Sequence, residues 1–219
     1  MALSTKALTT VANVKTYLDI SDTSQDTKIE QLINSVSDDI ASRCNRVFLS
    51  AERTEKLTGN GRQTLLLTYY PITDVKSVTV DSAALTEGTD FDVLADEGSL
   101  FKVNGVWTKP EVNQVFRPPY IPEIPYADEN SLKHNIEAVY TAGYILPYQA
   151  SSGETPVVPT LPYDLEMACI KMIAADINRK GSEHEKSENL GPLQSAFLDN
   201  DYSDSVLSVL ERYKRPVIV

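Results

Sequence analysis

The first fifty residues carry apolar side chains at helical spacing. Val11, Val14 and Leu18 follow one another at steps of three and four, and the pattern resumes after Asp26. Because such steps place side chains on one face of a helix, the segment predicts two helices joined by a turn at residues 19–22. The apolar stripe of the second helix comprises Ile29, Leu32, Ile33, Val36, Ile40 and Cys44.

From about residue 52 the pattern changes from helical to alternating. Runs rich in β-branched and aromatic residues are separated by glycine-containing turns, as at residues 59–61 and 104–105. Runs of this kind with short links are typical of antiparallel strands. The segment 51–144 is therefore predicted to hold a small subdomain of four to six short strands. The runs lie at residues 65–67, 75–80, 91–94, 99–103 and 136–141.

The last third of the chain returns to helical spacing. One helix is expected to open at Pro162, and another runs from about Tyr202 and ends before Pro216. The predicted fold class is α+β, with a core of about four helices packed as an antiparallel bundle, an inserted small β subdomain and proline-rich arms. The predicted domains are an N-terminal helical hairpin of the core (1–50), the inserted β subdomain (51–144), and an extended linker with C-terminal helices that complete the core (145–219).

Proline marks the irregular segments. Nine of the 12 prolines lie between residues 110 and 162, which favours stiff, extended backbone. The loop 110–126 is open to two interpretations. It is a solvated loop, or it is an arm that lies across a neighbouring subunit, because exposed aromatic and aliphatic side chains in loops often mark contacts. The anchors of such an arm would be Tyr120, Ile121, Ile124 and Tyr126.

The net charge narrows the classes of partner. Among 219 residues, 20 Lys and Arg stand against 31 Asp and Glu, which gives a formal charge of −11. Such a chain is a poor candidate for gripping nucleic acid, since affinity for phosphate depends mainly on Lys and Arg. The segments 1–50, 51–144 and 145–219 carry −1, −6 and −4, so the inserted subdomain is the most acidic part.

The chain shows no signal for export or for membrane insertion. Its first residues lack the apolar region of a secretory signal, and no window approaches the roughly 18 consecutive apolar residues that span a bilayer. We therefore expect a soluble protein that is made in a cytoplasm and has no membrane partner.

The sequence offers little material for catalysis or metal binding. His134 lies in a polar loop, and the adjacent groups of Glu183–Glu185 lack the spacing that lets side chains converge on one metal from a helix. No phosphate-binding loop, dinucleotide fingerprint or nucleophile elbow is present. We expect no enzyme activity, no catalytic or metal-binding residues and no cofactor. An enzyme would need a polar pocket around His134 or Glu183–Glu185. The two cysteines, Cys44 and Cys169, are interpreted as buried thiols.

The C-terminal end joins a basic cluster to an apolar tail. Cations are favourable at the C-terminal end of a helix because they complement its dipole. This effect alone can explain the basic residues, and no binding partner is then needed. The apolar tail either packs on its own domain or docks on another protein, for example by strand addition. The residues concerned are Arg212, Lys214, Arg215, Val217, Ile218 and Val219.

Several stretches of the chain occur in an order that a known family shares. They are Leu8–Leu18 with the turn that follows, Asp26–Ile33 running into Ile40–Asn45, Tyr70–Val78, Val139–Tyr144, Leu161–Cys169 and Leu207–Pro216. Together they resemble the head–tail connector proteins of tailed phages, also called adaptor or head-completion proteins. The resemblance covers most of the chain, although the proline-rich span 110–125 is absent from short members.

The resemblance implies a structural virion protein of the neck, made in the host cytoplasm. It implies a twelvefold ring under the portal that joins the DNA-filled head to a downstream neck, stopper or tail-completion protein. Together with the net charge of −11, such a ring predicts an acidic channel through which DNA passes without specific binding. The basic and then apolar ending of the chain leads to the hypothesis that the tail 212–219 docks on the portal. Composition leaves one alternative open, a monomeric acidic module that binds a peptide or glycan through the β subdomain and a tyrosine-rich loop.

Overall fold

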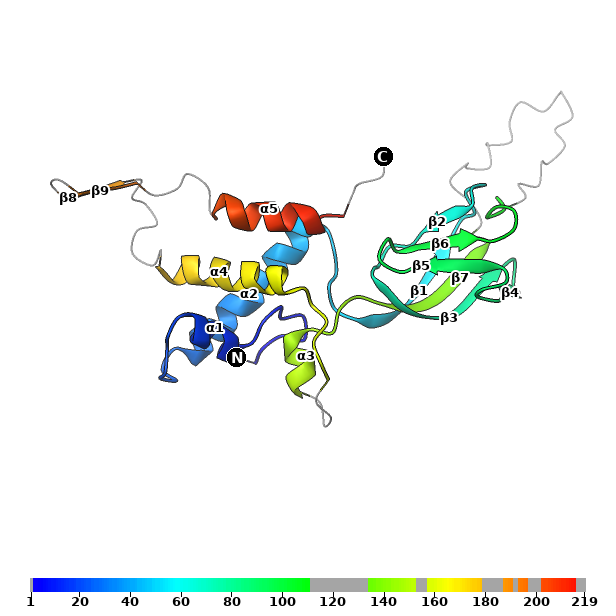
Figure 1. Cartoon of the computed structure of the whole chain (residues 1–219). Helices are drawn as coiled ribbons and strands as arrows, with labels where there is room; N and C mark the ends of the chain where they lie inside the picture. The colour runs from blue at the N-terminus through cyan, green and yellow to red at the C-terminus, as the bar shows by residue number, and fades with distance from the viewer. Residues whose placement is uncertain are drawn as a thin grey trace, which may run out of the picture. The chain divides into compact units, whose positions relative to one another are not determined.

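The structure is a computed structural model, which describes residues 2–110, 134–152, 157–178, 187–190, 193–196 and 202–215. Its backbone divides into two compact units (Figure 1). The helical unit joins Met1–Leu49 to Tyr144–Val219, and the strand unit is the continuous segment Ser50–Gly143.

The helical unit contains five helices within its described residues. They are α1 (Val11–Tyr17), α2 (Asp26–Cys44), α3 (Pro147–Ser152), α4 (Tyr163–Asn178) and α5 (Asp204–Tyr213). The Thr10 hydroxyl accepts a hydrogen bond from the Asn13 N–H at 3.3 Å and thereby caps the start of α1. Asn45, in the left-handed region at φ 48°, ends α2. A two-stranded hairpin, β8 (Ser187–Leu190) with β9 (Leu193–Ala196), also belongs to this unit.

The core of the helical unit brings together the two ends of the chain. Helix α2 contacts both α4 and α5, and α1 contacts α2 and α4. Ile33 on α2 and Leu165 on α4 are fully buried in this core. Non-helical segments contribute as well, since Ala7, Leu8, Phe48, Leu146 and Leu161 are also buried there.

The strand unit contains seven strands within its described residues. They are β1 (Ala51–Leu57), β2 (Thr64–Leu66), β3 (Ile72–Val80), β4 (Ala83–Leu85), β5 (Phe91–Leu94), β6 (Ser99–Lys102) and β7 (Ile136–Ala142). One sheet has the order β1-β7-β3-β4 and the other β2-β6-β5, and every pairing between these strands is antiparallel.

Trp107 lies at the centre of the strand unit. Its ring is buried beside Phe91, with ring centroids 6.4 Å apart, and its indole N–H donates to the Gln63 carbonyl at 2.9 Å. Next to it, the chain packs too closely for a side chain at Gly59, where a Cβ would lie 1.8 Å from the Thr108 carbonyl oxygen. Asn135 closes this corner by accepting from the Gly59 N–H and donating to the same Thr108 carbonyl.

The predicted fold class, a bundle core of about four helices with a small β insertion, is wrong. Helix α1 has seven residues and α3 has six, too short for the long antiparallel seams of a bundle. Loop residues complete the core beside α2, α4 and α5. The fold is mixed and rich in strands, because residues 50–143 form two antiparallel sheets with a hydrophobic core of their own.

Helix α3 also differs from expectation, because it lies where proline spacing predicts extended backbone. Pro147 occupies its first position, where the missing N–H of proline costs no hydrogen bond. Among the helices in the described ranges, none combines the length and apolar content that crossing a membrane requires.

Candidate functional site

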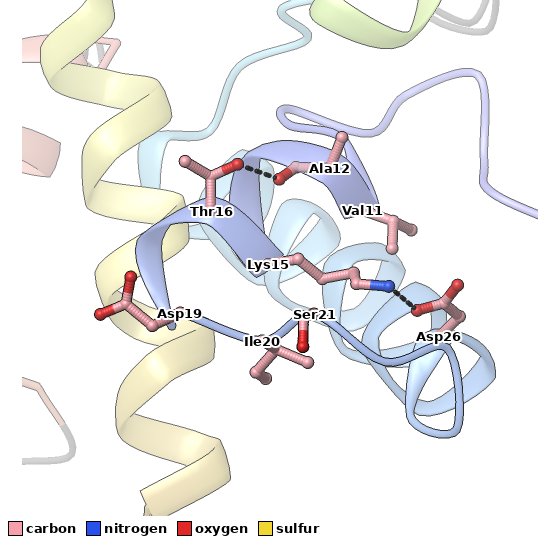
Figure 2. Close-up of a pocket in the computed structure, with 8 residues that line it drawn as sticks. All are labelled: Val11, Ala12, Lys15, Thr16, Asp19, Ile20, Ser21 and Asp26. Carbon is pink, nitrogen blue, oxygen red and sulfur yellow. Dashed lines mark hydrogen bonds and ion pairs between the residues drawn. The ribbon is translucent and has the colours of Figure 1, made fainter.

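An open hollow lies beside the α1–α2 hairpin in the helical unit. It has a volume of about 640 Å³. Figure 2 shows its lining, with one wall from α1, the rim from the connecting turn and Asp26 from the start of α2. The apolar members are Val11, Ala12 and Ile20, and the polar ones are Lys15, Thr16, Asp19, Ser21 and Asp26.

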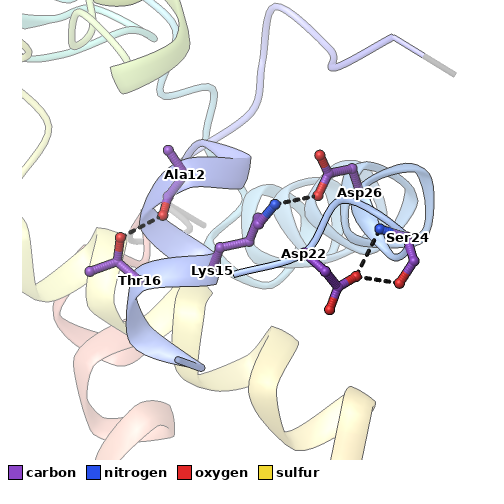
Figure 3. Close-up of polar contacts among 6 residues, drawn as sticks. All are labelled: Ala12, Lys15, Thr16, Asp22, Ser24 and Asp26. Atoms are coloured by element: carbon purple, nitrogen blue, oxygen red, sulfur yellow. Dashed lines mark hydrogen bonds and ion pairs between the residues drawn. The ribbon is translucent and has the colours of Figure 1, made fainter. Parts of the chain in front are cut away.

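Polar contacts fix the shape of this hairpin (Figure 3). The Lys15 ammonium contacts Asp26 Oδ1 at 2.8 Å, which ties α1 to the first turn of α2. In the turn, the Ser24 hydroxyl and N–H both donate to Asp22, and these bonds hold the pKa of Asp22 below its ordinary value. Asp19 adopts a left-handed φ of 55° that closes the end of α1. The hollow is therefore bounded by backbone that local contacts hold in place.

The C-terminal helix is held to the rest of the helical unit through Asp164. The Tyr213 hydroxyl donates to Asp164 Oδ1 at 2.6 Å, and the Arg212 guanidinium contacts Oδ2 at 3.0 Å. The Arg215 N–H donates to the Cys44 carbonyl at 2.9 Å, which fastens the end of α5 to the end of α2. Burial, aided by the bond to Asp164, raises the pKa of Tyr213.

Both cysteines lie in the core of the helical unit as free thiols. Burial raises the pKa of Cys44 to about 11 and the pKa of Cys169 to about 12. Thiols with raised pKa values are poor nucleophiles and poor metal ligands at neutral pH. In the described residues, no three His, Cys, Asp or Glu side chains are grouped so as to hold a metal ion.

A second polar hollow lies in the strand unit and includes His134. It has a volume of about 240 Å³, and its lining includes Lys56, Asp81 and Glu137. His134 Nδ1 lies 3.3 Å from the Thr58 hydroxyl. The other histidine-containing segment that an enzyme would need, Glu183–Glu185, lies outside the described residues.

Large apolar side chains are exposed at the start of α4. Tyr163 is 86% exposed and Met167 is 39% exposed, and Val158 in the preceding segment is 79% exposed. Tyr163 and Met167 are four residues apart and therefore share a face of the helix. Exposed apolar side chains that share one helix face make this surface a candidate contact surface.

The predicted contact residues fall partly within the described structure. Arg212, Lys214 and Arg215 lie at the end of α5, where Lys214 contacts Glu211 at 3.0 Å and Arg212 contacts Asp164. The basic cluster is thus partly neutralised within its own chain. The remaining residues lie outside the described ranges, namely Val217, Ile218 and Val219 of the tail and Tyr120, Ile121, Ile124 and Tyr126 of the arm.

Comparison with known families decides the class of protein. A family described as head completion protein matches residues 7–125, which is more than half of the chain and includes the hairpin and its hollow. The chain belongs to the head completion protein family. The resemblance to head–tail connector proteins is thereby confirmed, and the protein is a structural connector between the head and tail of a virion.

A solved structure supports the same fold for this head completion protein. A chain in the neck of an empty GTA particle, computed with C6 symmetry, matches with a TM-score of 0.53 and 16% sequence identity. The match covers 100% of this chain and 95% of that chain, so it extends over both units. A search of curated proteins returned no match.

Sequence reasoning did not find two surface features of the head completion protein. The hollow depends on how α1 and its connecting turn fold, which spacing alone does not show. The exposed pair on α4 did leave a signal, because Tyr163 and Met167 stand four residues apart on a different face from the buried Leu165 and Cys169. Apolar residues that share a face away from the core could have been identified as a contact surface.

Proposed function

We propose that copies of this protein form a ring at the head–tail junction, under the portal, and join the DNA-filled head to the next neck or tail protein. The match of residues 7–125 to the head completion family carries this proposal. The neck structure with the same fold was computed with C6 symmetry, a symmetry that a twelvefold ring satisfies. In the virion, the ring would surround the path of the genome.

The charge of the chain fits such a path. Each copy contributes −11, so a ring of copies forms a strongly negative assembly whose field acts within a Debye length of about 8 Å at physiological salt. Phosphates that meet few free cations bind weakly. In the described part of the chain, Lys15, Arg43, Arg212 and Lys214 are all engaged in ion pairs of the helical unit. DNA then slides through the ring without specific binding.

The portal-facing end is assigned to residues 212–219. Deleting the whole segment 212–219 would also remove the Tyr213 and Arg215 contacts that hold α5 in place, so a shorter deletion is needed. The suitable variant ends at Arg215 and lacks only the four residues beyond it. A charge variant, Lys214→Glu, probes the basic cluster, and Lys109→Glu on an exposed position of the strand unit is its matched control.

The experiment uses particles from a phage that lacks this gene, supplied with the variant proteins. We expect electron microscopy to show DNA-filled heads without tails when the protein is absent. The full chain should restore tailed particles and appear as a ring under the portal, whereas the chain ending at Arg215 should keep its circular dichroism but fail to bind the heads. Tailed particles without any protein would overturn the connector role, and normal capture of the shortened chain would overturn docking by the tail.

A further inference from the structure

The exposed face of α4 carries a stripe built from three residue types. Tyr163, Met167 and Lys171 follow one another at intervals of four residues, so they share one face of the helix, and each is exposed. Lys171 forms no ion pair with the part of the chain that the structure describes. The stripe thus presents an aromatic ring, a thioether and an uncommitted cation in a row.

The α1–α2 hollow offers complementary chemistry. Val11, Ala12 and Ile20 supply apolar surface, and Asp19 stands in the connecting turn (Figure 2). Asp26 is occupied by Lys15 at 2.8 Å, whereas Asp19 is exposed and has no hydrogen bond or ion pair to the described residues. The hollow therefore combines three apolar residues with one uncommitted anion in a mainly polar lining, and these two features suit the apolar pair and the uncommitted cation of the α4 stripe.

The stripe and the hollow are separate surfaces of the helical unit, because no residue of the stripe lines the hollow. Asn13 donates to Glu166 at 2.7 Å, so the Asn13 face of α1 is turned toward α4. The residues of α1 that line the hollow are Val11, Ala12, Lys15 and Thr16. At 100° per residue, Val11 and Lys15 lie about 160° from Asn13 around the axis of α1, whereas Thr16 lies only about 60° from it. Within one copy, Tyr163, Met167 and Lys171 are exposed and none of them lines the hollow, so the hollow is open to the stripe of a second copy.

A contact between two different surfaces of the same protein determines how its copies assemble. A stripe that fits a hollow elsewhere on the same molecule gives a head-to-tail contact, which generates a ring if the rotation closes. Copies that each carry −11 repel one another, so a contact with a cation opposite an anion offsets that repulsion locally. We infer that the α4 stripe of one copy docks in the α1–α2 hollow of the neighbouring copy, with Lys171 facing Asp19, as the contact that builds the ring of the proposed function.

Cysteine cross-linking tests this contact on the full chain. Asp19→Cys and Lys171→Cys proteins with different tags are mixed under mild oxidation. We expect disulfide-linked heterodimers, while the native Cys44 and Cys169 stay protected by burial. Ser21→Cys, on the same rim, serves as a second variant if Asp19→Cys does not fold. The matched control pairs Asp19→Cys with Lys109→Cys on the strand unit. Heterodimer formation no greater than in this control overturns the contact.

Charge exchange tests the same contact without cross-linking. Lys171→Glu and Asp19→Lys should each weaken association by about threefold or more, and the double variant should restore it. Tyr163→Ala should weaken association by about tenfold, as at an aromatic interface anchor, with unchanged circular dichroism. Asp92→Lys, at an exposed position of the strand unit, is the control for net charge. Equal weakening by Asp92→Lys, or no restoration in the double variant, overturns the pairing.

The two proposals can fail separately. If particles contain a ring but the cross-link is absent, the ring stands and this contact is wrong. If the cross-link forms but electron microscopy of particles shows no ring under the portal, the contact stands and the ring of the proposed function is wrong.

Discussion

The strand unit is made from one continuous stretch of chain, whereas the helical unit is made from two stretches separated by almost a hundred residues. Both units bury their own hydrophobic core. In the strand unit, neighbouring strands such as β5 and β6 pair across short turns. In the helical unit, Ile33 near the N-terminus packs in the same core as Leu165 and Leu210 near the C-terminus.

This difference indicates how each unit depends on the whole chain. The helical core is complete only when α4 and α5 reach α2, so damage at either end of the sequence should unfold that unit. The buried core residues of the strand unit all lie within residues 65–142, so this unit should stay folded when either end of the chain is altered. The single tryptophan, Trp107, is buried in the strand unit and reports on that unit alone, while circular dichroism reports mainly on the helices.

The largest expected effect comes from a cavity in the core of the helical unit. Ile33→Ala should lower the free energy of unfolding of that unit by about 2–5 kcal/mol, because Ile33 is fully buried. In urea, the midpoint measured by circular dichroism should fall while the midpoint measured by Trp107 fluorescence stays unchanged. Leu100→Ala, equally buried in the strand unit, should give the reverse result. If both probes shift together in both variants, the units unfold as one and the comparison fails.

Alkaline pH should lower the stability of the helical unit more than that of the strand unit, and this effect should be smaller than the effect of the core cavity. Burial raises the pKa of Cys44 to about 11 and that of Cys169 to about 12, from an ordinary value near 9. Above pH 9 the unfolded chain therefore loses thiol protons that the folded chain keeps, so stability falls as pH rises. The expected loss is about 1 kcal/mol per thiol between pH 9 and pH 10.

The strand unit contains no cysteine, and its Trp107 midpoint should change much less over this interval. Its buried Tyr140 has a raised pKa, and an unfolded tyrosine with an ordinary pKa near 10 is half ionised at pH 10, so the strand unit should lose only about 0.4 kcal/mol between pH 9 and pH 10. The measurement is urea unfolding at pH 8, 9 and 10 by both probes. The double variant Cys44→Ala and Cys169→Ala should lose most of the pH slope of the helical unit, and the small remainder comes from tyrosines such as Tyr213, whose pKa is also raised. An undiminished slope in this variant contradicts the assignment to the thiols.

Much of the secondary structure could be predicted from the sequence, because spacing is local. The steps of three and four from Ile29 to Cys44 predict a helix, and α2 spans Asp26–Cys44. The β-branched run at 75–80 likewise falls within β3. How these elements pack could not be predicted, because it depends on contacts distant in sequence. Trp107 filling the centre of two sheets is one such contact, and its residue type alone does not indicate it.

The candidate surfaces were predictable to a lesser degree. The basic residues Arg212 and Lys214 were visible in the sequence, but their ion pairs with Asp164 and Glu211 were not, because the first joins residues 48 positions apart. Asp19, which lines the α1–α2 hollow, has a left-handed φ of 55°. An aspartate in that conformation has no unique sequence signature, since most aspartates occupy ordinary backbone regions.

The smallest expected effect concerns the ion pair that closes the α1–α2 hairpin. Lys15 and Asp26 have side chains that are 16% and 35% exposed, so their attraction is only partly screened by water. Asp26 also lies in the first turn of α2, where a negative charge is favourable. Asp26→Asn should therefore destabilise the helical unit by up to about 1 kcal/mol, measured by circular dichroism in urea, and leave the Trp107 midpoint unchanged. The loss should shrink in 1 M salt.

Asp19→Asn is the matched control for this variant, because it removes a carboxylate from the same hollow that has no partner among the described residues. It should leave stability unchanged. A double-mutant cycle with Lys15→Met and Asp26→Asn isolates the coupling between the two charges. A coupling near zero, or an equal loss in Asp19→Asn, would mean that the hairpin is held by its apolar contacts alone. The helical unit would then resemble the strand unit in depending on its buried core and not on its surface charges.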